Sequence, residues 1–78
     1  MTAAEKRALA AVDAGEVVRV YKSDRNILRG PRGVGAATLW RLEGNKLISD
    51  GGPCWGHLER TCRQVLTDAG RKALADQE

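Results

Sequence analysis

Residues 34–48 have the sequence VGAATLWRLEGNKLI, which holds a helix, its stop and the start of a strand. Apolar side chains recur every three or four positions in the first ten residues, and this spacing predicts an amphipathic helix over residues 34–43. Gly44 is typical of a C-terminal helix stop. The apolar pair Leu47–Ile48 comes after that stop and predicts the beginning of a β-strand.

The chain that follows predicts a second strand and a last helix. Residues 49–56 contain four glycine or proline residues, so we expect a turn-rich loop there. A return strand is expected over residues 58–66. Thr67 is a good N-cap, and Asp68 places a negative charge in the first turn, where the helix dipole favours it. These signals predict a helix over residues 68–76.

The chain that precedes the opening stretch predicts a helix and a hairpin. Residues 3–14 are rich in Ala, Glu, Lys, Arg and Leu, which favour a helix, and Gly15 is a plausible stop. Residues 17–21 are rich in valine and predict a strand. The polar residues 22–26 predict a turn, after which residues 27–28 resume the apolar pattern of a hairpin.

The size and charge of the chain limit what it can do. Its 78 residues make one domain, residues 1–78, with a thin core and little room for an enclosed substrate pocket. We therefore expect no small-molecule substrate, and a homodimer would bury more surface. The net charge of +3 suits a phosphate backbone or an acidic protein as partner. The same charge argues against a protein that mimics DNA.

Two segments resemble a known family. Residues 65–74, VLTDAGRKAL, look like the LTxxGRxAL ending of MarR-like and related small winged-helix proteins of bacteria, and residues 34–48 resemble their recognition helix and first wing strand. The resemblance implies an α+β, small winged-helix-like domain with the order helix, hairpin, helix, hairpin (the wing), helix. In that family the helix before the wing enters the major groove of double-stranded DNA.

The resemblance implies a small DNA-binding regulator of transcription, of bacterial, phage or plasmid origin. In this reading Arg41 reaches a base edge, because its planar fork can pair with guanine. Arg29 and Arg32 meet phosphates beside the start of the helix, and Arg60 or Arg63 serves the wing. The residues expected at DNA are Arg29, Arg32, Arg41, Arg60 and Arg63.

The alternative is a protein-interaction module on the same scaffold, such as a phage-encoded inhibitor of a host protein. Trp40 lies opposite the apolar stripe of its helix, so it is expected to point outward. A partner, the first hairpin of the same monomer, or DNA could cover it. Trp55 lies in a Gly-rich segment, where it either folds back on its hairpin or inserts into a partner.

Catalytic and metal chemistry have little support in the sequence. Cys54, His57 and Cys62 are three soft ligands, whereas a structural zinc site needs four. The chain has one histidine and lacks a phosphate loop and a serine nucleophile motif. We therefore expect no enzyme activity, no metal and no cofactor, and we expect both cysteines to be free thiols.

The sequence also predicts a cytoplasmic protein. The first residues lack a long apolar run and include Glu5 and Asp13, so no signal peptide is expected. The chain contains no stretch of roughly 20 apolar residues, the length that a membrane span needs. Two cysteines without a secretory signal are typical of a reducing compartment.

Overall fold

The local sequence signals set the ends of the first and last helices. Helix α1 (Ala3–Asp13) begins after Thr2, whose hydroxyl accepts the Glu5 N–H (3.1 Å) while the Glu5 carboxylate accepts the Thr2 N–H (3.0 Å). This reciprocal capping pairs two N–H groups that the helix leaves free. Helix α3 (Asp68–Ala75) is capped by Thr67, as predicted, through a hydrogen bond from Gly70 N–H (3.1 Å).

The computed structural model describes residues 1–76. It has three helices and four strands, and helices α1 and α3 end within one residue of the predicted positions. In chain order the elements between them are β1 (Val18–Tyr21), β2 (Asn26–Arg29), α2 (Ala36–Gly44), β3 (Ile48–Trp55) and β4 (Arg60–Leu66).

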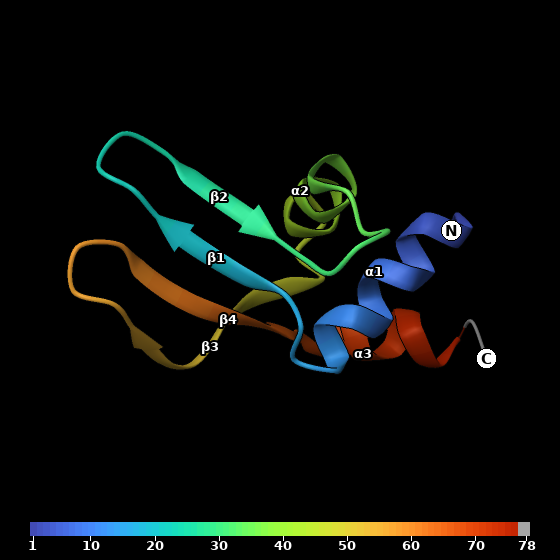
Figure 1. Ribbon diagram of the computed structural model, residues 1–78. Helices are drawn as coiled ribbons and strands as arrows, with labels where there is room; N and C mark the ends of the chain where they lie inside the picture. The colour runs from blue at the N-terminus through green and yellow to red at the C-terminus, as the bar shows by residue number, and fades with distance from the viewer. Residues whose placement is uncertain (77–78) are drawn as a thin grey trace.

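The four strands form one antiparallel sheet with the order β2-β1-β4-β3. The α+β class is therefore confirmed. The arrangement differs from a separate wing, because β1 pairs with β4 and joins both hairpins into a single sheet. The helices gather at one end of this sheet, and the strand turns project from the other end (Figure 1). The molecule is accordingly elongated, with extents of 39 × 21 × 20 Å.

The prediction of a loop over residues 49–56 is wrong, because most of this segment belongs to β3. Ser49 and Gly51 pair with Val65 and Arg63, and Trp55 pairs with Thr61 farther along β4. The register shifts between Gly51 and Trp55, so the glycine- and proline-rich stretch forms an irregularity within the strand. Pairing with a partner strand thus overrides the local preference for a turn.

The strands alternate between a covered face and an open face. In β4, Cys62, Gln64 and Leu66 are buried, whereas Arg63 and Val65 are exposed. The covered face meets the helices and contributes to the hydrophobic core, whose buried members are Ala8, Leu9, Ala11, Val12, Val17, Leu28, Leu39, Leu42, Ile48 and Leu66.

The prediction that Cys54 and Cys62 are free thiols is also wrong. The two residues form a disulfide between β3 and β4, with their Cα atoms 4.4 Å apart. The sequence argument used only the absence of a secretory signal, whereas strand pairing brings the two side chains together on the covered face. None of the helices in residues 1–76 has the length and apolar character needed to cross a membrane.

Candidate nucleic-acid interface

The open face of the sheet carries two rows of side chains that run across the strands. Directly paired residues of neighbouring strands point to the same face, so the register defines each row. The basic row consists of Arg29, Val18, Arg63 and Gly51, from β2 through β1 and β4 to β3. The apolar row consists of Ile27, Val20, Thr61 and Trp55 in the same strand order.

The two rows lie close together and place the two arginines within reach of one extended ligand. Adjacent rows on one face are separated by two residues, or roughly 7 Å along the strand. Arg29 and Arg63 stand on strands that are two positions apart, so their backbones are roughly 10 Å apart. Both arginines are exposed, whereas Val20 in the apolar row is 8% exposed.

Arg63 leans toward the end of α1. Its side-chain stem would lie 3.6 Å from a Cβ placed on Gly15, the second residue after that helix. The carbonyl groups at a helix C-terminus attract positive charge, so this position favours the guanidinium. The contact draws the stem of Arg63 toward the end of α1, and the residue stays exposed.

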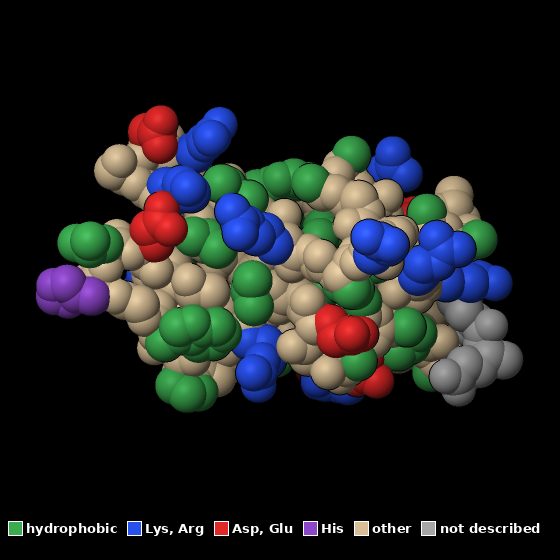
Figure 2. Space-filling model, in the orientation of Figure 1, with side chains coloured by type: hydrophobic (Ala, Val, Ile, Leu, Met, Phe, Trp, Pro, Cys, Tyr) green, Lys and Arg blue, Asp and Glu red, His purple; other side chains and the backbone are tan. Residues whose placement is uncertain are grey.

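The charges on the open face are not neutralised by the chain itself. The ion pairs found within residues 1–76 are Arg19–Glu43 (3.4 Å), Lys22–Glu59 (3.2 Å) and Arg71–Asp68. None involves Arg29 or Arg63, and the strand positions of the open face carry no acidic residue in this described part of the chain. Figure 2 shows hydrophobic and basic side chains beside one another on the half of the molecule formed by the strands, with acidic side chains toward the end where the strands turn.

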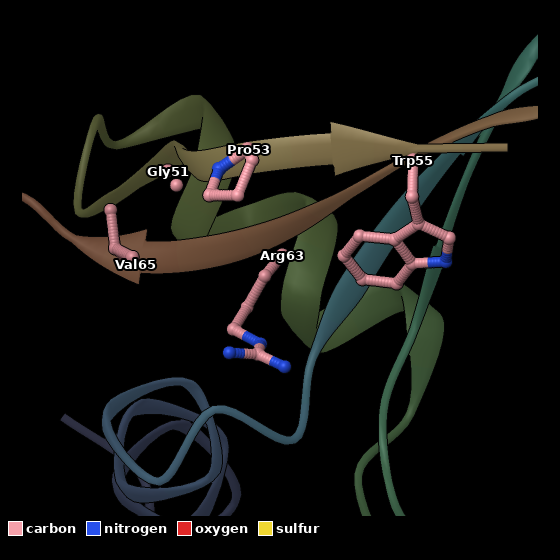
Figure 3. A pocket seen from close by; sticks show the side chains of 6 residues that line it. Gly51, Pro53, Trp55, Arg63 and Val65 are labelled. Atoms are coloured by element: carbon pink, nitrogen blue, oxygen red, sulfur yellow. The ribbon is translucent and has the colours of Figure 1, made fainter.

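A groove opens at the β3 end of the basic row. Its volume is about 300 Å³, which lies at the lower end of the range for small-molecule sites. Figure 3 shows Trp55 and Arg63 on the two sides of this groove, with Val65 farther along β4. A Cβ on Gly51 would overlap the side chain of Val65, so only glycine lets β3 approach β4 this closely. The lining residues are Gly51, Gly52, Pro53, Trp55, Arg63 and Val65.

The covered face continues beyond the helices as a stack of aromatic and basic side chains. The Arg19 guanidinium lies over the rings of Trp40 (5.4 Å) and Tyr21 (5.9 Å), and Arg60 lies over Tyr21 (5.6 Å). Arg19 also pairs with Glu43 of α2 (3.4 Å). Cation–π contacts and an ion pair therefore tie α2 to β1.

Asp50 of β3 is hydrogen-bonded to Tyr21 of this stack. It accepts hydrogen bonds from the hydroxyl of Tyr21 and from Nε2 of the fully buried Gln64 (2.7 Å). Burial alone would raise the pKa of Asp50, but these two hydrogen bonds, together with Arg19 and Arg60, lower it below its ordinary value. The stack therefore balances its cations with internal carboxylates, unlike the open face.

The structure separates the five predicted DNA-binding arginines. Arg29 and Arg63 share the basic row, whereas Arg60 stacks on Tyr21 on the covered face. Arg41 is exposed on α2, and Arg32 is exposed in the connection between β2 and α2. The five arginines thus do not form one surface.

The two tryptophans also lie apart. Trp40 is 38% exposed, and Arg19 of the first hairpin covers part of its ring, which matches the intramolecular alternative. Trp55 is 49% exposed and lies at the end of β3, on the wall of the groove. His57 is exposed in the following turn, and the disulfide removes both thiolates that a metal site there would need.

Sequence reasoning missed the residues that give the open face its apolar character. Val18 and Val20 were assigned to a strand, but their face depends on the pairing of β1 with β4. The alternation of Arg63 and Val65 with Cys62, Gln64 and Leu66 is the one local signal that separates the two faces. Comparisons with protein-family models, with curated proteins and with solved structures find no match to this chain.

Proposed function

We propose that this protein binds nucleic acid through the open face of its sheet and acts as a binding protein rather than an enzyme. The observation that carries the proposal is the basic row, in which Arg29 and Arg63 are exposed and have no carboxylate partner within residues 1–76. Each guanidinium can donate two parallel hydrogen bonds to a phosphate. The net charge of +3 favours the same partner at long range.

The resemblance to winged-helix regulators suggests duplex DNA as the ligand and a second binding surface on the α2 side. Arg41 would then read a base edge, with Arg32 on a phosphate, and the protein would regulate transcription. The exposure of both arginines supports binding at this surface. However, the exposed residues Ala36, Ala37 and Trp40 offer α2 few groups that can read bases, and a hairpin takes the place of the helix that precedes a recognition helix.

The test is fluorescence anisotropy with a labelled duplex DNA over a series of salt concentrations. Binding should weaken with a log–log slope of about −0.9 per phosphate contact. The double variant Arg29→Gln/Arg63→Gln should flatten this slope by about 1.8, because it removes two contacts. The matched control Arg32→Gln/Arg41→Gln removes the same charge from the α2 side and should leave the slope nearly unchanged.

The salt slopes distinguish binding through the sheet from binding through α2. If only the α2-side variant flattens the slope, binding runs through the recognition helix. If the wild-type protein binds neither this duplex nor a single-stranded oligonucleotide at low salt, the proposal is wrong.

The groove favours an acidic protein as the second candidate. Trp55 and Val65 are exposed large hydrophobic residues that meet there, and exposed tryptophans often anchor protein interfaces. Arg63 at the groove edge would pair with a carboxylate of that partner. An acidic peptide tested beside DNA in the same anisotropy assay separates this candidate from the first.

A further inference from the structure

We propose that the groove beside Trp55 holds an unpaired nucleobase, so that the preferred ligand is single-stranded nucleic acid. This inference rests on the proposed function and names its substrate class. The groove and the basic row are continuous, because Arg63 belongs to both. A strand lying on the sheet can therefore place a base against Trp55 and its phosphates along the row toward Arg29.

The groove has the shape and surface that a base requires. Trp55, which is 49% exposed, lines the groove, and three of the other lining residues, Gly51, Gly52 and Pro53, have small or compact side chains. Its surface is largely apolar, and Arg63 is the one charged side chain in its lining. An aromatic wall next to a cation is the combination that proteins use to bind single strands without sequence preference.

A duplex cannot use this groove in the same way. Its bases are paired and stacked on one another, so they present edges rather than free faces. An acidic peptide would pair with Arg63 through a carboxylate and would need a separate apolar side chain to contact Trp55, whereas a nucleotide carries its planar ring and its phosphate on one unit. The combination of one aromatic wall and two separate arginines therefore favours bases and phosphates on one chain over either alternative.

The experiment reads the environment of Trp55 directly. In the variant Trp40→Phe, Trp55 is the one remaining tryptophan, and the phenylalanine keeps a ring against Arg19. A short oligothymidylate should quench the fluorescence of this variant. An abasic oligonucleotide of the same length carries the phosphates without the bases, so it should bind more weakly and leave the fluorescence unchanged.

Substitution of Trp55 provides the second measurement. Trp55→Ala should weaken binding of the oligothymidylate about 10- to 100-fold and leave duplex binding nearly unchanged. The matched control is Leu58→Ala, which removes an exposed residue (91%) of the same hairpin that does not line the groove. This control should bind like the wild-type protein, and circular dichroism should show that both variants are folded.

The outcomes separate this inference from the function on which it rests. Equal affinity for the oligothymidylate and its abasic counterpart, or binding without quenching, overturns the base site while nucleic-acid binding stands. Loss of all binding at low salt, single-stranded and duplex alike, overturns the proposed function. Tighter binding of polyglutamate than of the oligothymidylate overturns both proposals in favour of an acidic protein.

Discussion

Reduction of the disulfide between Cys54 and Cys62 should destabilise the domain by an amount that follows from the chain length between them. The two residues are separated by 8 positions. Closing a loop of this size removes chain entropy from the unfolded state that is equivalent to about 2.5 kcal/mol at 25 °C. A domain of this size has a total stability of roughly 4–12 kcal/mol, so the bond contributes a large share of it.

The assay is urea unfolding followed by circular dichroism, with and without a phosphine reductant. The free energy of unfolding should fall by about 2.5 kcal/mol, and the melting temperature by roughly 10–20 °C. Reductant on the wild-type protein is the cleaner perturbation, because Cys62 is fully buried and its substitution also removes packing. The double variant Cys54→Ala/Cys62→Ala is the control, and reductant should not change its unfolding.

Two results would refute this reasoning. Mass spectrometry of alkylated native protein could find two free thiols, in which case the cysteines are not bonded. A change of less than about 1 kcal/mol on reduction would mean that the unfolded chain is already restricted between β3 and β4.

Gly70→Ala should lower the stability by about 1–2 kcal/mol although alanine favours helices, because a Cβ would overlap the Leu47 carbonyl oxygen. The control is Gly44→Ala, because a Cβ on Gly44 meets no atom. If urea unfolding shows that Gly70→Ala is as stable as the wild-type protein, the expected overlap with the Leu47 carbonyl oxygen does not occur. Trp40→Ala should cost about 1 kcal/mol and leave the oligomeric state unchanged, since an arginine already covers the ring; a change in light scattering would instead reveal an interface. The lowered pKa of Asp50 contributes stability that is present above its unfolded-state pKa and is lost as the pH falls through the lower folded-state value. Wild-type protein should therefore lose more stability than Asp50→Asn between neutral pH and pH of about 3, and equal losses in urea would show that Asp50 does not contribute.

The helices could be predicted from the sequence because their signals are local. The capping threonine at Thr67 and the stop at Gly15 act within a few residues, and both helices that they delimit end near the expected positions. Strand β3 could not be predicted in the same way. Its glycines and proline favour a turn by themselves, and pairing with β4 becomes visible only once the two strands are aligned.

The candidate site likewise combines residues that the sequence identifies with a spatial arrangement that depends on strand pairing. The sequence identifies Arg29 and Arg63 as exposed cations, but they are 34 positions apart in the chain. They share a row because Val18 pairs with both, and the pairing of β1 with β4 is not encoded in any short segment. The disulfide also depends on strand pairing. The absence of a secretory signal indicates a reducing compartment, but it does not show whether two cysteines face each other across a pair of strands.

The irregular part of β3 has a consequence for how copies of this protein behave at high concentration. An edge strand with free N–H and C=O groups is a template on which another chain can add. Pro53 has no N–H, and Gly52 has a φ of +67°, which a regular strand does not adopt. The interruption therefore limits the pairing of another chain at the β3 edge of the sheet. The domain can therefore keep Trp55 exposed at the end of β3 without the β3 edge nucleating fibres.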